Sequence, residues 1–563
     1  MKKFFGYSIH EGICSGQVAV LKNDEYRLNF SSIEEEELKL ENAISRLRTK
    51  LTSLLDSLRK KDLKNINILQ INLMILEDRD LINEIKSHIR NEKSLLDSLN
   101  KVSKKYFEDT SSRNYTNFLD VCRSILDEVV DRKIDYSALN NKIVVTDNLH
   151  VTQLLEFADQ GISIKGLVLI SGSRNSHLAI VIKSLGIPSI TGVDIPISFS
   201  SDNCYAILDS RVGFENIILN PSDEVKTFYL AILEKSMSDS KRLDYFRDKE
   251  AITKNNEKVN LGASLVSTTK LEKIEGIYFD ELGLMRTEFL FAGRDIFPNQ
   301  DEQLEVLKSV LPYFEGKCVN IRLFDLGSEK YLYNLPISQL DESSLGIRGT
   351  RFLLNNTNLL KSQLKAILRF SYFINVTVVY PFVTNLSEII QMNKILEKCK
   401  EELASDNFKF DEEIKVGCLI ETPASAVMSD QIIDLVDKVM LGVNDLTQHT
   451  LACSRFNINL EYMYDFFDSS VFRLIKKTLD NANDKGKSAI VCGEICNSEI
   501  GVAALLILGA RSIATSWNYS SKIKKLISKI DLTNTEEIRN YIINSGSAET
   551  NKSIISMFLN DMP

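Results

Sequence analysis

The first proline of this 563-residue chain is Pro188, and no glycine occurs between Gly16 and Gly161. Proline and glycine mark turns and interrupt helices, so their absence argues against short strands and tight turns in this stretch. The residues from Ser31 to about Leu139 are therefore predicted to form several long helices packed as a bundle. Ser32 is the expected N-cap of the first helix, and its apolar residues recur near helical spacing at Leu38, Leu40, Ile44, Leu47, Leu51 and Leu54.

Other absences narrow the class of protein. No apolar run is long enough for a membrane span, and the first residues lack the apolar core of a secretory signal, so we expect a cytoplasmic protein without membrane insertion. The net charge is −9 with no long Lys/Arg block, which argues against nucleic acid as a partner. The nine cysteines lack paired metal-ligand spacing, which is typical of reduced thiols.

The residues after the bundle change in character. Short β-rich runs at 143–145 and 166–170 alternate with short helices, which indicates an α/β unit. Because residues 1–20 also end in a strand-like run, we expect them to rejoin this unit, with the bundle as an insertion. A charged helical stretch at 223–252 is predicted to be a linker helix.

A polar turn inside the α/β unit carries the first candidate for chemistry. The sequence Gly-Ser-Arg-Asn-Ser-His at 172–177 follows a buried strand and opens a short apolar helix. A histidine there can act as a nucleophile, and a helix N-terminus favours an incoming phosphoryl group. His177 is therefore a candidate phosphohistidine, although a lone histidine in such a turn is more often a solvated loop residue.

From residue 252 to the end, strands alternate with helices. Eight repeats of this kind in one domain predict a (β/α)8 barrel, whose active site would lie at the carboxyl ends of its strands. The expected strands are Lys258–Gly262, Gly283–Thr287, Cys318–Phe324, Val376–Pro381, Lys415–Glu421, Lys438–Val443, Ser488–Cys492 and Arg511–Thr515.

The predicted strand ends carry charged and polar residues that a packed barrel does not need for stability. They are Arg286, Arg322 with Asp325 and Lys330, Glu421, Asn444 with Asp445, and Cys492 with Glu494; connecting segments add Arg348 and Arg455. Any one of these arginines is explained as readily by a surface ion pair. Together, guanidinium groups and two carboxylates suit a small anion that carries phosphate and carboxylate and is bridged by Mg²⁺.

Six motifs occur in order along the chain. They are the histidine turn, Gly-Leu-Met-Arg-Thr-Glu-Phe-Leu at 283–290, Asp-Leu-Gly-Ser-Glu-Lys at 325–330, Leu-Ile-Glu-Thr-Pro-Ala at 419–424, Gly-Val-Asn-Asp-Leu-Thr-Gln at 442–448 and Cys-Gly-Glu at 492–494. In these motifs the chain resembles phosphoenolpyruvate-protein phosphotransferase, enzyme I of the bacterial sugar phosphotransferase system.

The resemblance implies a role for each candidate. His177 would take the phosphoryl group of phosphoenolpyruvate and pass it to a histidine of the carrier protein HPr, the first step of sugar uptake. Cys492 would protonate the enolate carbon to give pyruvate. The expected Mg²⁺ ligands are Glu421 and Asp445, the expected phosphate-binding residues are Arg286, Arg322 and Lys330, and Arg348, Asn444 and Arg455 would bind the rest of the substrate.

The resemblance also implies a separate function for each domain. We expect residues 1–20 and 142–222 to form the phosphohistidine domain, 21–141 the carrier-binding bundle, 223–252 the linker, and 253–563 a barrel that binds phosphoenolpyruvate and forms a homodimer. The chain departs from the family pattern at Asn72, Ser173, Asn175, Lys183, Ser328 and Val443, among others.

Two alternatives accompany this reading. The departures would also suit a regulatory or divergent paralogue that binds phosphoenolpyruvate or a non-standard carrier with poor turnover. A dikinase or pyruvate-water kinase has similar domains, but it would need a nucleotide-binding domain for which the chain has no room.

Overall fold

The computed structural model describes residues 1–21, 30–60, 67–91, 93–109, 112–130, 136–147, 149–172, 177–196, 204–211, 213–268, 271–291, 296–325, 345–455, 460 and 462–562. The chain divides into two compact units, Met1–Ser236 and Met237–Pro563. No helix within the described ranges is both long and apolar enough to cross a membrane.

The first unit is built around an eight-stranded mixed sheet with the order β1-β8-β7-β3-β4-β5-β6-β2. Strands β3 to β6 run parallel, while β1, β2, β7 and β8 pair antiparallel with their neighbours. The strands are β1 (Lys2–Phe5), β2 (Tyr7–His10), β3 (Ile13–Leu21), β4 (Ile143–Thr146), β5 (Gly166–Leu169), β6 (Ser189–Thr191), β7 (Tyr205–Asp209) and β8 (Asn216–Leu219).

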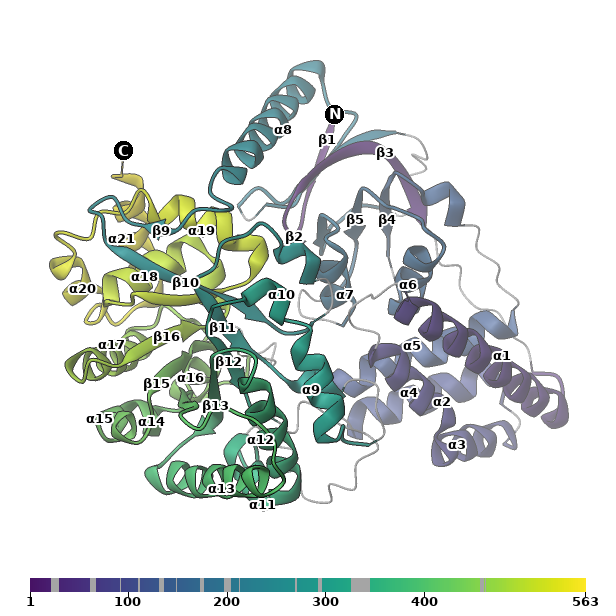
Figure 1. Cartoon of the computed structure of the whole chain (residues 1–563). Helices are drawn as coiled ribbons and strands as arrows, with labels where there is room; N and C mark the ends of the chain where they lie inside the picture. The colour runs from purple at the N-terminus through teal and green to yellow at the C-terminus, as the bar shows by residue number, and fades with distance from the viewer. Residues whose placement is uncertain are drawn as a thin grey trace. The chain divides into compact units, whose positions relative to one another are not determined.

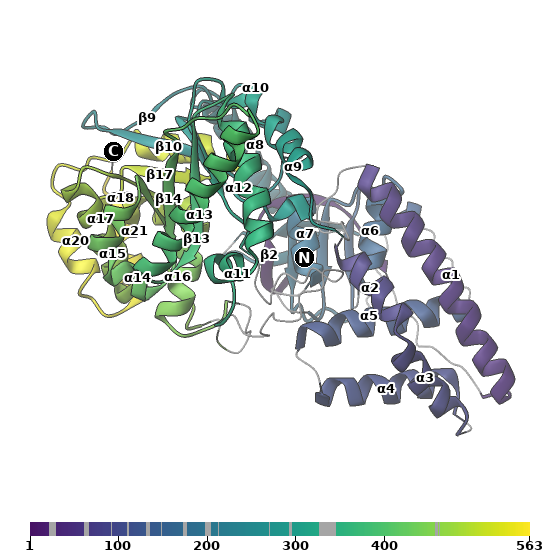
Figure 2. The ribbon, with the colours of Figure 1, turned by 60° about the horizontal axis from the view of Figure 1, so that its bottom comes forward.

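Helices α1 to α5 occur in the chain between β3 and β4, which are adjacent strands of one sheet, and they lie together (Figure 2). The predicted α/β unit with an inserted helical bundle is therefore confirmed. The helices of this unit are α1 (Ile33–Lys60), α2 (Asn67–Glu77), α3 (Arg79–Ile89), α4 (Leu95–Asp109), α5 (Ser112–Val129), α6 (Val151–Asp159), α7 (His177–Leu185) and, continuing into the next unit, α8 (Asp223–Asp244). The linker helix expected over residues 223–252 therefore ends at Asp244, and residues 251 and 252 form a short strand instead.

The first helix of the bundle begins where the sequence indicates. The hydroxyl of Ser32 accepts the backbone N–H of Glu35 at 3.2 Å, which makes Ser32 the N-cap of α1. Leu40, Leu47, Leu51 and Leu54 are buried, whereas Leu38 is exposed. The helical spacing of these residues is present in α1, and Leu38 lies outside the face that packs on the other helices.

The second unit is a closed barrel of eight parallel strands, β10 to β17, surrounded by helices (Figure 1). The pairing of β10 with both β17 and β11 closes it, and β9 adds one antiparallel pair. The strands are β9 (Ala251–Ile252), β10 (Lys258–Leu265), β11 (Glu281–Met285), β12 (Val319–Arg322), β13 (Val376–Val383), β14 (Lys415–Ile420), β15 (Lys438–Gly442), β16 (Ser488–Cys492) and β17 (Ser512–Thr515).

All eight predicted barrel strands are present, with ends that differ by a few residues. The strand expected over residues 318–324 ends at Arg322, and the one expected to end at Pro381 continues to Val383. The helices are α9 (Gln300–Lys308), α10 (Leu311–Phe314), α11 (Gly349–Asn355), α12 (Thr357–Ser371), α13 (Leu386–Ser405), α14 (Pro423–Val427), α15 (Ser429–Ile432), α16 (Val443–Thr450), α17 (Ser469–Asp484), α18 (Glu499–Leu508), α19 (Ser520–Ile527), α20 (Glu536–Ile542) and α21 (Ala548–Asn560).

Short 3₁₀ turns complete the secondary structure of both units. They are η1 (Tyr136–Leu139), η2 (Leu271–Ile274), η3 (Glu288–Phe291), η4 (Ile433–Leu435), η6 (Glu494–Asn497) and η7 (Trp517–Tyr519).

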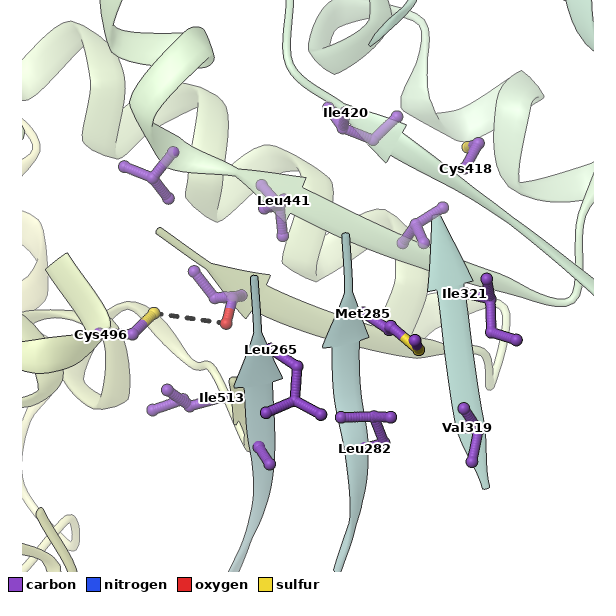
Figure 3. Packing of buried hydrophobic residues seen from close by; sticks show 14 of the residues in the cluster. Leu265, Leu282, Met285, Val319, Ile321, Cys418, Ile420, Leu441, Cys496 and Ile513 are labelled. Atoms are coloured by element: carbon purple, nitrogen blue, oxygen red, sulfur yellow. Dashed lines mark hydrogen bonds between the residues drawn. The ribbon is translucent and has the colours of Figure 1, made fainter. Parts of the chain in front are cut away.

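Alternate residues of the barrel strands face two different cores, as the period of a strand requires. One set packs inside the barrel and consists of Leu284, Val379, Leu419, Met440, Ile490, Cys492 and Ala514. The other set packs between the strands and the helices and includes Leu265, Met285, Ile321, Ile420 and Leu441 (Figure 3). Packed on both sides, the strands form a rigid base for the side chains at their ends.

Candidate active site

Polar and charged side chains gather at the carboxyl end of the barrel. Arg322 and Cys492 are the last residues of β12 and β16, Glu421 follows β14 directly, and Asn444 and Asp445 lie in the first turn of α16 after β15. Because the strands are parallel, their carboxyl ends meet at one face. The structure thus brings these predicted residues together.

Arg322 lies among three carboxylates and is buried. Its Nη2 donates to Oε1 of Glu288 at 2.6 Å, and its Nη1 lies 3.5 Å from Asp325 and 3.7 Å from Glu421. Burial acts to lower the pKa of Arg322, but the three carboxylates outweigh it and hold the pKa above its ordinary value. The guanidinium therefore stays charged and fixed.

Arg348, also buried, belongs to the same network although it follows no strand. It precedes α11; its Nη2 and Nε lie 2.8 Å and 3.3 Å from the Asp325 carboxylate, and its Nη1 lies 3.4 Å from Asp445. Its guanidinium stacks 4.2 Å from the centre of the Phe382 ring. Gly349 permits this approach, because it has φ +52° and a Cβ atom there would lie 2.5 Å from that of Phe382.

Glu421 is a buried carboxylate held by the backbone. Its Oε2 accepts the N–H of Phe382 at 3.1 Å, and it lies against Gly442, where a Cβ atom would come within 2.5 Å of its Cγ. Burial first, and then the negative charge of Asp445, raise the pKa of Glu421 to about 7, while Arg322 and Arg348 act in the opposite direction. The two carboxylates are therefore close enough to repel each other.

This donor set fits a hard divalent cation such as Mg²⁺, which binds one or two protein carboxylates and takes its remaining oxygens from water or substrate phosphate. A cation held by Glu421 and Asp445 would offset the repulsion that, after burial, contributes to the raised pKa of Glu421. In the described part of the chain no three His, Cys, Asp or Glu side chains converge as a complete protein site.

Cys492 lies inside the barrel, in the apolar layer formed with Leu419, Met440 and Ile490. Burial first, and then the charge of Glu421, raise the pKa of the Cys492 thiol to about 12, while Arg286 and Arg322 act to lower it. The thiol therefore keeps its proton at neutral pH. Four residues later, the thiol of Cys496 donates to the carbonyl of Val491 at 3.3 Å (Figure 3).

Asn444 is anchored to the segment that follows Cys492. Its Oδ1 accepts the backbone N–H of Glu494 at 2.9 Å, and its own carbonyl accepts the Tyr464 hydroxyl at 3.0 Å. Arg455 lies close enough to Tyr464 for its charge to act on the phenol, and its backbone N–H donates to Gln448 at 3.3 Å. Both residues thus belong to the same end of the barrel.

Two guanidinium donors remain available for an anion. Within the described ranges, Nε of Arg286, next after β11, and Nε of Arg322 are buried and have no hydrogen-bond acceptor. Buried donors are normally paired, so these two atoms suit an acidic ligand.

The structure describes the remaining predicted site residues only in part. Lys330, like Ser173, Asn175 and Ser328, lies outside the described residues. His177 is the first residue of α7, directly after the part of the turn that is not described, and it belongs to the first unit. Among the departures from the family pattern, Asn72 and Val443 are buried and Lys183 is exposed.

Sequence reasoning missed several residues of this site. Glu288, in η3, holds Arg322; Phe382 touches both Arg348 and Glu421; Tyr464 contacts Asn444. Glu288 lies within the motif at 283–290, which offered a signal, whereas Phe382 stands in an apolar run typical of core.

Comparison with known proteins agrees with this geometry. A family model described as "PEP-utilising enzyme, PEP-binding domain" matches residues 240–532. The chain belongs to the PEP-utilising enzymes. Two further models, for the N-terminal and mobile domains of PEP-utilising enzymes, match residues 6–114 and 139–213.

Relatives along the whole chain are named phosphoenolpyruvate-protein phosphotransferase. The one from Listeria monocytogenes is 28% identical, covering 97% of this chain and 98% of its own length. Those from Mycoplasma capricolum and Borreliella burgdorferi are also 28% identical and cover 100% and 99% of both chains. The resemblance inferred from the sequence motifs is confirmed.

Proposed function

We propose that this protein transfers the phosphoryl group of phosphoenolpyruvate to its own His177 and then to a histidine of an HPr-type carrier protein, releasing pyruvate. This would be the first step of sugar uptake by a phosphotransferase system. The observation that carries the proposal is the buried cluster of arginines and carboxylates around the Cys492 thiol. Full-length relatives with the corresponding name support it.

In this proposal the arginines bind the two acidic ends of the substrate. Arg286 and Arg322, with Lys330, contact the phosphate, and the buried donors of the two arginines suit its oxygens. Arg348, Asn444 and Arg455 bind the remainder of the substrate, including its carboxylate. Fixed positive charge of this kind stabilises phosphoryl transfer without reorganisation during the reaction.

Glu421 and Asp445 would hold Mg²⁺. When bound, the cation neutralises charge on the phosphoryl oxygens. The protein's part is to keep both carboxylates in place, through the Phe382 N–H on Glu421 and through Arg348 beside Asp445.

Cys492 is the proposed proton donor to the enolate carbon. A general acid must carry its proton before the reaction, and burial keeps the pKa of this thiol at about 12. The apolar layer around Cys492 would also exclude water from the thiol.

The proposed division of labour follows the domain boundaries expected from the sequence. Residues 1–20 and 142–222 would carry the phosphohistidine, 21–141 would dock the carrier, and 223–252 would link them to a barrel at 253–563 that also forms a homodimer. The three family models that match successive parts of the chain support such a division.

The test is incubation of the full-length protein with ³²P-labelled phosphoenolpyruvate and Mg²⁺, followed by mapping of the labelled residue. We expect label on His177 and its loss in His177→Ala, while His88→Ala, a change in α3 of the bundle, retains it. Adding an HPr-type carrier should then discharge the label.

Two failures would mean different things. An unlabelled, folded wild-type protein that still binds phosphoenolpyruvate would favour the regulatory paralogue. Label on His177 that an HPr-type carrier does not remove would overturn the proposed partner but not the chemistry.

A further inference from the structure

Phe382 has an unusual backbone for its position. It lies in β13, next to a break in the pairing with β14. Tyr380 pairs with Cys418 and Val383 pairs with Ile420, so between these two pairs β13 has one residue more than β14, which makes a β-bulge. Its φ is +50°, in the left-handed region that a bulky aromatic residue rarely adopts. Such bulges re-aim side chains and often occur beside active sites.

The bulge makes two contacts with the candidate site. The Phe382 ring lies 4.2 Å below the Arg348 guanidinium, and the Phe382 N–H donates to Glu421 at 3.1 Å. Neighbouring contacts fix the bulge itself: Thr350 donates its hydroxyl to the Pro381 carbonyl at 2.5 Å, and His449 packs edge-on against the ring at 5.1 Å. One residue therefore touches both an arginine and a carboxylate of the site.

We propose that Phe382 is a positioning residue whose ring orients Arg348 toward the substrate carboxylate and whose N–H orients Glu421 toward the metal. The inference rests on the proposed function of those two residues. It accounts for a strained aromatic residue at this position, because strain of this kind persists where the surroundings fix it at a functional site.

The ring contact can be tested without changing the shape of the site. Replacing Phe382 by mono-, di- and trifluorophenylalanine withdraws electron density from the ring face and weakens its attraction for a cation. We expect the KM for phosphoenolpyruvate to rise stepwise, to about tenfold for the trifluoro ring, with kcat nearly unchanged. The same series at Phe370, buried in the core on α12, should leave KM unchanged.

The backbone contact can be tested separately. Replacing the Phe382 residue by phenyllactic acid turns the Pro381–Phe382 amide into an ester, which removes the N–H and also weakens the Pro381 carbonyl as acceptor for Thr350. Because a hydrogen bond to a charged group is lost, we expect Mg²⁺ affinity, measured by calorimetry, to fall by about tenfold, with a smaller effect on KM.

The outcomes separate this inference from the proposed function. Suppose that His177 is labelled normally, that the fluorinated series does not change the KM for phosphoenolpyruvate and that the ester does not change the Mg²⁺ affinity. The proposed role of Phe382 is then wrong, while the proposed phosphotransferase function is retained. If His177 is not labelled but calorimetry shows that phosphoenolpyruvate binds and that fluorination of Phe382 weakens this binding, the role of Phe382 is supported and the proposed phosphotransferase function is wrong. No binding of phosphoenolpyruvate at all overturns both.

Discussion

The Nη2 atom of Arg348 lies 2.8 Å from Oδ2 of Asp325, and both side chains are buried at the carboxyl end of the barrel. The same Asp325 oxygen lies 3.5 Å from Nη1 of Arg322. Asp325 thus joins an arginine proposed to bind phosphate to one proposed to bind carboxylate. It bridges the two guanidinium groups, each of which also pairs with a second carboxylate, Glu288 for Arg322 and Asp445 for Arg348.

Asp325→Ala is expected to weaken substrate binding more than it slows chemistry. Without the carboxylate both arginines lose their common anchor, and misplacing a binding group by about 1 Å costs up to roughly 100-fold. We expect the KM for phosphoenolpyruvate to rise by roughly 10- to 100-fold, and the free energy of unfolding to fall by about 3 kcal/mol because a buried pair is broken. Steady-state kinetics and urea unfolding measure the two effects.

The matched control for Asp325→Ala is Glu305→Ala. Glu305 is exposed on α9 and pairs with Lys308 at 2.8 Å, so its removal should change stability by less than about 1 kcal/mol. An unchanged KM in Asp325→Ala would show that the arginines do not depend on this anchor.

Glu421→Gln and Asp445→Asn should each raise the Mg²⁺ concentration needed for half-maximal labelling of His177, by roughly tenfold or more. Both substitutions keep the shape of the side chain and remove its charge. Excess chelator should abolish labelling in the wild type. Glu388→Gln is the control, since Glu388 is also buried but lies on the outer helix α13 and accepts hydrogen bonds from Thr384 and Arg351. An equal effect there would argue against a metal at Glu421 and Asp445.

Cys492→Ala should reduce pyruvate formation by at least roughly 100-fold, the usual contribution of a general acid. Binding of phosphoenolpyruvate, measured by calorimetry, should change little, because the arginines that bind the anion remain. Cys418→Ala removes an equally buried thiol from the outer face of β14, so it should cost stability but not turnover. Normal pyruvate formation by Cys492→Ala would point to another proton donor.

The eight barrel strands could be predicted because each is a short apolar run followed by a helix. Arg286, Arg322, Glu421 and Cys492 were predicted for the same reason, since each ends or directly follows a strand. Arg348 precedes α11 and follows no strand, so only the family resemblance gave it a role.

The contacts between these residues could not be read from the sequence. Phe382 stands in an apolar run of the sequence. Its left-handed φ could not be predicted, because that conformation is usually expected only at glycine or asparagine. Gly349, which lacks the Cβ atom that would collide with Phe382, lies more than thirty residues earlier in the chain. Such a match between distant backbones arises only from tertiary packing.

Lys524 provides a test of the barrel's stability apart from its chemistry. Its side chain, 1% exposed on α19, donates to the carbonyls of Arg247 at 2.9 Å and Tyr278 at 2.7 Å. Burial lowers the pKa of Lys524 to about 8, against about 10.4 in an unfolded chain. Below pH 8 both states carry the proton and the cost of the buried charge is present in full.

Above pH 8 the folded state releases this proton while the unfolded state keeps it until about pH 10.4. The unfolded state then binds more protons, so Lys524 should raise the free energy of unfolding between pH 8 and 10, by about 2 to 3 kcal/mol. The measurement is urea unfolding followed by the fluorescence of Trp517, the single tryptophan, which lies just before α19. Lys524→Met should lack this rise, whereas Lys522→Met, which removes an exposed lysine from the same helix, should keep it. Parallel pH profiles for wild type and Lys524→Met would show that the Lys524 ammonium is not destabilised by its burial.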